Sequence, residues 1–96
     1  MSSSYRARVE VAPGLWARLT LRHYRRLEEL AEQRGLASVS DAAKQALAEA
    51  LGVGLEALGS QVKKLAERRG LTITGVVAYI LERYFYSRQA KNLTPL

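Results

Sequence analysis

Two stretches of the chain carry apolar residues at the spacing of an amphipathic helix. Both follow an i, i+3, i+4, i+7 pattern, and the second repeats the first at an offset of 34 positions, as from Val39 to Ile73. The first stripe consists of Val39, Ala42, Ala43, Ala46, Leu47, Ala50 and Leu51, and the second of Ile73, Val76, Val77, Ile80, Leu81, Tyr84 and Phe85. The pattern predicts two helices, one in each copy of an internal repeat.

Each copy of the repeat also contains an earlier helix. Residues 27–36 and 62–71 are identical at six of ten positions, which predicts helices over Leu21–Arg34 and Leu55–Arg69. Thr20 is expected to cap the first helix, and Gly35 and Gly70 to end the two helices in the left-handed conformation. Their inward residues are expected to be Tyr24, Leu27, Leu30 and Ala31 in the first, and Leu58, Val62, Leu65 and Ala66 in the second. The later helix of each copy has two possible N-caps. They are Ser38 or Ser40 in the first copy, and the equivalent Thr72 or Thr74 in the second.

Polar and apolar residues alternate before the repeat begins. Residues 6–11 and 15–19 both have the period of a half-buried strand, and Pro13-Gly14 between them is a turn signal. If Val11 pairs with Leu15, the apolar residues of both strands share one face. A two-residue loop would break that match, so the alternation alone leaves the register open.

These segments predict a single domain over residues 1–96 that is mostly helical, with a short antiparallel β-ribbon at its N-terminus. The ribbon is expected over residues 5–19, the first helix pair over 20–51 and the second over 55–87. Residues 88–96 are expected to form a flexible tail.

The balance of charge narrows the possible partners. Fifteen Lys and Arg stand against nine Asp and Glu, for a formal net charge of +6 and a pI near 10.1. A small basic domain attracts polyanions, and nucleic acid is the commonest of these. The chain has no cysteine, no apolar run that could span a membrane and no apolar signal-peptide core at its start. We therefore expect an intracellular, cytoplasmic protein that has no membrane partner.

The first half of the chain resembles the ribbon-helix-helix (Arc/MetJ/CopG-like) family of DNA-binding regulators. The resemblance lies in a short strand, Leu15-Trp16-Ala17-Arg18-Leu19-Thr20, a helix that ends in Gly35-Leu36, and a second helix that opens with Ser38-Val39-Ser40-Asp41. In that family two strands from two subunits form an antiparallel ribbon in the DNA major groove. The start of each second helix presents backbone N–H groups to a phosphate.

The resemblance implies two sets of DNA-binding residues. The base-reading side chains would be Arg6, Arg8, Trp16 and Arg18, and the phosphate-binding positions would be Ser38, Ser40, Thr72 and Thr74. Arg suits base reading because its guanidinium binds guanine bidentately. Glu10 departs from the pattern because phosphate repels a carboxylate, although Glu10 could accept a hydrogen bond from cytosine.

The N-terminal strand has no counterpart in a standard subunit of that family. One chain holds two strands and two helix pairs, which is the inventory of a complete dimer. We hypothesise a single-chain pseudodimer in which Pro13-Gly14 joins the strands and Gly52-Val53-Gly54 leads to the second helix pair. The small stripe of the first copy would then pack against the large stripe of the second. The alternatives are a conventional homodimer, or two pseudodimers side by side and cooperative on DNA.

Residues suited to catalysis are few. His23 is the only histidine and Asp41 the only aspartate, and the sequence shows no nucleophile–base pair, phosphate loop or metal-ligand spacing. We expect no enzyme activity, no cofactor and no metal. The expected function is sequence-specific binding of double-stranded DNA by a nucleoid-associated transcriptional regulator. The alternatives are non-specific coating of nucleic acid by an architectural protein and an antitoxin-like protein-interaction module.

Overall fold

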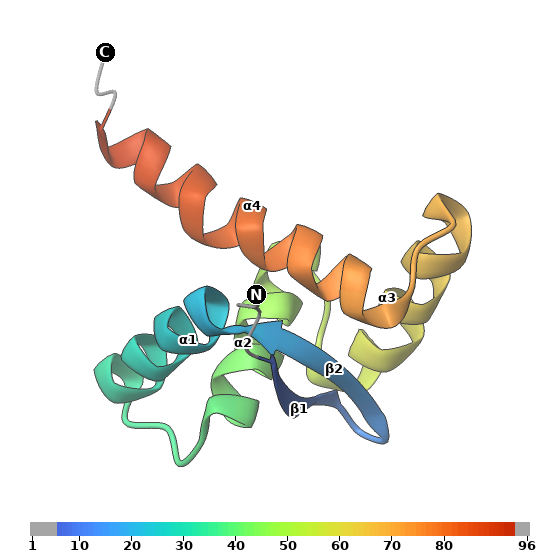
Figure 1. Ribbon diagram of the computed structural model, residues 1–96, viewed down its shortest axis with the longest axis horizontal. Helices are drawn as coiled ribbons and strands as arrows, with labels where there is room; N and C mark the ends of the chain where they lie inside the picture. Colours follow the sequence, from blue (N-terminus) through green and yellow to red (C-terminus); the bar gives the residue numbers. More distant parts are fainter. Residues whose placement is uncertain (1–5, 94–96) are drawn as a thin grey trace.

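A β-hairpin and four helices follow one another along the chain (Figure 1). The computed structural model describes the backbone of residues 6–93 and the side chains of residues 7–86. The elements are β1 (Arg6–Ala12), β2 (Leu15–Thr20), α1 (Leu21–Arg34), α2 (Val39–Leu51), α3 (Leu55–Arg69) and α4 (Ile73–Leu93). The expectation of a mostly helical fold with an N-terminal antiparallel ribbon is confirmed.

The ends of the chain differ from the expected boundaries in one respect. Helix α4 continues to Leu93, beyond residue 87, where the second helix pair was expected to end. The backbone of residues 88–93 is therefore helical. Residue 5, at the expected start of the ribbon, and residues 94–96 of the expected tail lie outside the described residues.

A β-bulge sets the register of the ribbon. Ala12, rather than the expected Val11, lies opposite Leu15, and the pairing shifts between Glu10 and Ala12. Val11 is therefore the extra residue of the bulge, which restores the alternation that a two-residue loop would otherwise break. The apolar face predicted by the alternation is confirmed, whereas the direct pairing of Val11 with Leu15 is wrong. The buried residues of the ribbon are Val9, Val11, Ala12, Ala17 and Leu19.

Polar caps and glycines bound the helices that open each repeat copy. Thr20 Oγ1 accepts a hydrogen bond from the backbone N–H of His23 at 3.2 Å, which caps α1 as expected. Gly35 and Gly70 end α1 and α3 with φ of +66°, a conformation that glycine adopts without steric cost.

Ser38 and Thr72 cap the later helices of the two copies. Each side-chain oxygen accepts a hydrogen bond from the backbone N–H three residues later, at 3.1 Å in α2 and 2.9 Å in α4. Of the two alternatives in the sequence, the earlier pair of hydroxyls is therefore the capping pair. Ser40 and Thr74 lie in the first turns of the helices and contact the ribbon instead.

The core lies where α2 and α4 pack against each other and against the ribbon. Helix α2 contributes small side chains and α4 contributes large ones, so the two stripes complement each other in volume. The fully buried residues of the pair are Ala42, Ala43, Ala46 and Leu47 in α2, and Val76, Val77 and Leu81 in α4. Ala50, in the last turn of α2, is exposed and does not share this burial. Helices α1 and α3 lie at opposite ends of the long axis (Figure 1).

Two polar clusters connect α1 with α4, the first of them through Glu49 of α2 and the second directly. Arg34 at the end of α1 donates to Glu49 at 2.6 Å, and the hydroxyl of Tyr84 in α4 donates to the same carboxylate at 2.6 Å. The Glu49 carboxylate raises the pKa of Arg34 above its ordinary value. At the other end of α1, His23 is buried and its Nε2 lies 2.9 Å from Glu82. The single histidine therefore has a packing role between the two helices.

Candidate nucleic-acid interface

The outer face of the ribbon is exposed, whereas its inner face packs on the helices. Arg8, Trp16 and Arg18 all project from this outer face, and Trp16 exposes 47% of its surface. Arg6 lies in β1 opposite Thr20, but its side chain is outside the described residues. The structure therefore brings three of the four expected base-reading side chains onto one surface.

Two arginines lie directly opposite each other on this face. Arg8 pairs in register with Arg18, and among the described residues no carboxylate forms an ion pair with either. Like charges in direct cross-strand contact are destabilising. The guanidinium carbon of Arg8 lies 5.0 Å from the centre of the Trp16 ring, within cation–π range. The result is a concentrated positive surface whose repulsion a bound polyanion would relieve.

Glu10, on the same face, is engaged by the protein itself. Its Oε2 accepts from the backbone N–H of Gly14 at 3.0 Å, and its Oε1 lies 3.5 Å from Nζ of Lys44. The hydrogen bond from Gly14, together with the charge of Lys44, lowers the pKa of Glu10 below its ordinary value of 4.5. The carboxylate thus fastens the turn to α2, and its charge is balanced within the molecule.

The first turns of α2 and α4 flank the ribbon on its two edges. Ser40 Oγ in α2 donates to the backbone oxygen of Glu10 in β1 at 2.5 Å. Thr74 Oγ1 in α4 accepts from the backbone N–H of Arg18 in β2 at 3.1 Å. These bonds satisfy one backbone group on each strand edge and place each helix start beside the outer face.

The helix starts keep hydrogen-bond donors for a ligand. The first N–H groups of a helix have no intrahelical partner, and those of Val39 and Ile73 make no other hydrogen bond within the described residues. Ser38 and Thr72 accept in their caps, so their hydroxyl protons are still available to donate. Ser40 uses its hydroxyl proton on the ribbon, which makes its side chain an anchor rather than a phosphate donor.

A shallow hollow joins the ribbon face to the start of α2. It has a volume of about 340 Å³ and is lined by residues of both strands, by Tyr24 of α1 and by Ser38, Val39 and Ser40. Arg8 and Trp16 form part of the same wall. Base-reading and phosphate-binding candidates therefore face one continuous depression.

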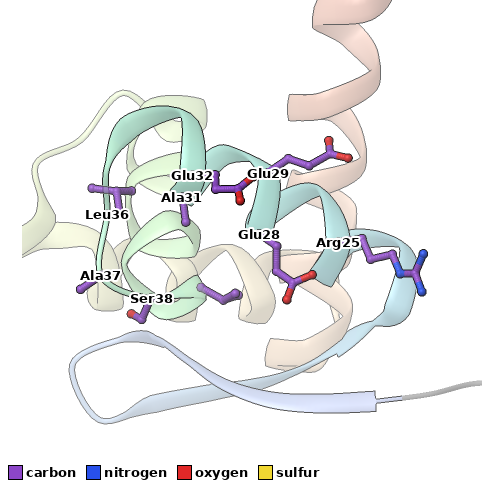
Figure 2. A pocket seen from close by; sticks show the side chains of 9 residues that line it. Arg25, Glu28, Glu29, Ala31, Glu32, Leu36, Ala37 and Ser38 are labelled. Carbon is purple, nitrogen blue, oxygen red and sulfur yellow. The ribbon is translucent and has the colours of Figure 1, made fainter.

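A larger hollow lies beside α1 and the start of α2, and its chemistry is different. It has a volume of about 620 Å³ and is lined by α1, by the turn that follows it, and by Ser38 and Val39, which also line the hollow at the ribbon face. Figure 2 shows the carboxylates of Glu28, Glu29 and Glu32 along this helix. This acidic wall is poorly suited to a polyanion, which leaves the ribbon face as the candidate interface.

Neither a metal centre nor a membrane span is found in the part of the chain that the structure describes. No three His, Asp or Glu side chains there gather to hold a metal ion, and no helix there is long and apolar enough to cross a bilayer. Comparison with protein-family models, with curated proteins and with solved structures gives no match. The function is therefore argued from the geometry of the chain itself.

The sequence reasoning missed Lys44 as part of this surface. Lys44 lies one helical turn after Ser40, so both reach β1 from the same face of α2. The signal that could have identified Lys44 was its i, i+4 spacing from Ser40, which was already a candidate site residue.

Proposed function

We propose that this protein binds double-stranded DNA in a sequence-specific manner by inserting the β1–β2 ribbon into the major groove, as a transcriptional regulator rather than an enzyme. The observation that carries the proposal is the pair formed by Arg8 and Arg18. Both are exposed and lack a carboxylate partner among the described residues, on a two-stranded ribbon with a helix start at each edge. The major groove of B-DNA, about 12 Å wide, admits a two-stranded ribbon.

Each part of the surface has a role in this proposal. Arg8 and Arg18 would donate hydrogen bonds to the O6 and N7 atoms of guanine, and the ring of Trp16 would contact a thymine methyl group. The free N–H groups at the starts of α2 and α4 would bind a phosphate on either side of the groove. Glu10 would not oppose binding, because Gly14 and Lys44 hold its carboxylate.

We also propose that the chain is a single-chain pseudodimer of the ribbon-helix-helix kind. The register places Val9 opposite Ala17, so a twofold axis through that pair relates ribbon residues eight positions apart, as from Glu10 to Arg18. The repeat relates positions 34 apart, as from Ser40 to Thr74. The same operation therefore exchanges the two residue pairs that join the helices to the ribbon, while the bonds themselves differ: Ser40 donates to the Glu10 carbonyl and Thr74 accepts from the Arg18 amide.

The packing of the elements supports the same relation. Helix α2 packs on β1 as α4 packs on β2, and α3 lies against β1 as α1 lies against β2. The contact between α1 and α4 likewise has its counterpart between α3 and α2. Two strands and two helix pairs arranged in this way correspond to the two subunits of a dimer.

A second candidate function is non-specific coating of nucleic acid. The net charge of +6 and an exposed Trp16 that could stack on any base favour it. It differs from the first proposal in that binding would not depend on base sequence.

Fluorescence anisotropy of labelled DNA over a range of salt concentrations tests both functions. We expect binding to duplex that weakens steeply with salt and a preferred site on selection from random duplex. Arg18→Ala should weaken binding to the preferred site about tenfold or more, and weaken binding to random duplex much less.

Arg83→Ala is the matched control. It removes the same charge from an exposed position in a hollow formed by the end of α2 and by α3 and α4. None of the residues that line this hollow belongs to the ribbon or to a helix start, so the variant should lower both affinities slightly and equally. An equal loss on both duplexes from Arg18→Ala would favour non-specific coating. Absence of duplex binding at low salt would contradict the first function, and absence of binding to both duplex and single-stranded DNA would contradict the second as well.

A further inference from the structure

The two halves of the ribbon face carry different chemistry. On one side of the ribbon centre the outward cross-strand pair is Arg8 with Arg18, and on the other side it is Glu10 with Trp16. The proposed twofold relation makes Arg8 equivalent to Trp16 and Glu10 equivalent to Arg18. A homodimer would necessarily present the same pair in both halves. Among the side chains that the structure describes, this chain presents two arginines in one half of the ribbon face and none in the other.

The halves also differ in what they can offer a base pair. The arginine half supplies two exposed guanidinium groups, which are donors without acceptors. In the unbound protein the guanidinium carbon of Arg8 lies 5.0 Å from the centre of the Trp16 ring, so Arg8 would exchange this contact for a guanine on binding. In the other half both oxygens of Glu10 are engaged, by the Gly14 amide and by Lys44. Trp16 is therefore the main exposed contact there, and it offers an aromatic surface. Donors of this kind select guanine, and apolar contacts select the methyl group of thymine.

We infer that this protein recognises a non-palindromic duplex site and binds it in a single orientation. A guanine-containing half-site lies under Arg8 and Arg18, and an A·T-containing half-site lies under Trp16. The inference rests on the proposed function. Dimers of two identical subunits favour palindromic sites because their halves are identical, and that reason does not apply to this ribbon.

Selection from random duplex tests the symmetry of the site. The recovered consensus should lack twofold symmetry, with guanine confined to one half. Three duplexes then measure the preference: the selected site, a palindrome of its guanine half and a palindrome of its A·T half. The A·T palindrome should bind about a hundredfold more weakly than the selected site, because two arginine–guanine contacts worth about tenfold each are lost. The guanine palindrome should bind more weakly by a smaller factor.

Directed cleavage tests the orientation. The chain has no cysteine, so an iron chelate can be attached at Ser60→Cys in α3 or at Glu29→Cys in α1. These two exposed positions lie on the helices at opposite ends of the long axis. On the selected site each variant should cleave one flank, and the two variants should cleave opposite flanks. Equal cleavage of both flanks by each variant would overturn the inference.

Trp16→Arg tests the residue that makes the halves unequal. Trp16 exposes 47% of its surface and its ring contacts the exposed side chain of Arg8, so the variant should fold as the parent does, and circular dichroism checks this. It should gain a guanine preference in the second half-site, which makes the guanine palindrome bind at least tenfold more tightly than it binds the parent. If the variant and the parent bind the guanine palindrome with the same affinity relative to the selected site, the assignment of Trp16 to the A·T half is overturned.

The outcomes separate this inference from the function on which it rests. Duplex binding with a palindromic consensus, or with no consensus, overturns the non-palindromic site and leaves duplex binding intact. Absence of binding to any duplex overturns the proposed function, and this inference with it.

Discussion

At the scale of single residues, Glu10 shows how a carboxylate can lie on a basic surface without weakening it. Its two oxygens are bound by the Gly14 amide and by Lys44, so its charge serves the turn and the junction with α2. Its pKa lies below the ordinary value of 4.5 in the folded protein. A depressed folded pKa contributes stability above the unfolded pKa, and that stability is lost as the pH falls through the folded pKa.

We therefore expect Glu10→Gln to reduce the acid sensitivity of the fold. The amide cannot titrate, so the variant should lose less of its stability between pH 7 and pH 3 than the parent. It should be less stable at pH 7, because a neutral amide accepts the hydrogen bond from Gly14 more weakly than a carboxylate and has no charge interaction with Lys44. Urea unfolding at several pH values measures this difference. Glu28→Gln is the control, because Glu28 is exposed and forms no ion pair within the described residues. The same acid slope in Glu10→Gln and in the parent would contradict the role given to Glu10.

At the scale of elements, two hydroxyls join the helices to the ribbon edges. Thr74 accepts from the Arg18 amide of β2, and Ser40 donates to the Glu10 carbonyl of β1. A two-stranded ribbon has two open edges, each with backbone groups that need partners. These bonds therefore fix the positions of α2 and α4 relative to the ribbon. They thereby also fix where the free backbone N–H groups at the two helix starts lie.

Thr74→Val is expected to loosen one edge and leave the other unchanged. Valine keeps the shape of threonine but cannot accept a hydrogen bond, so the Arg18 amide loses its partner at a cost of about 1 kcal/mol. Hydrogen exchange followed by NMR should show faster exchange of the Arg18 amide in this variant. Thr74→Ser keeps the acceptor and should preserve the protection. Unchanged exchange in Thr74→Val would show that the bond does not hold the edge.

The helices were predictable because their signals are local. The apolar spacing around Leu47 and Leu81, the hydroxyl of Thr20 and the glycine at position 35 each act within a few residues of the chain. The choice between Ser38 and Ser40 as cap was not predictable in this way. Both offer the same hydroxyl, and contact with a distant strand determines which of them remains for the cap.

The ribbon face was predictable in composition but not in register. Alternation marks Arg8, Trp16 and Arg18 as outward residues without any knowledge of the fold. The bulge at Val11 follows from a competition between a tight two-residue turn and burial of the apolar face, and both terms involve residues of two strands. The pairing of Lys44 with Glu10 depends in turn on that register, so the sequence alone did not reveal it.

At the scale of the whole molecule, the two copies of the repeat complement each other within one chain. The small stripe of α2 packs against the large stripe of α4, and the middle of each stripe, residues 42–47 in α2 and 76–81 in α4, provides the buried positions. Among the described residues, the large apolar side chains that remain exposed come from five different segments of the chain: Trp16, Leu21, Leu55, Leu71 and Tyr79. Exposed apolar residues distributed in this way are ordinary on a monomer. We therefore infer that the core formed by the described residues is complete within one copy of the chain.

We therefore expect the protein to be a monomer in solution over a wide range of concentration. Multi-angle light scattering should give a mass near 10.7 kDa, and small-angle X-ray scattering a compact particle consistent with a Cα radius of gyration of 13.2 Å. Thermal unfolding should not depend on protein concentration, because no association contributes to stability. A particle of twice that mass, with a melting temperature that rises with concentration, would favour the conventional homodimer.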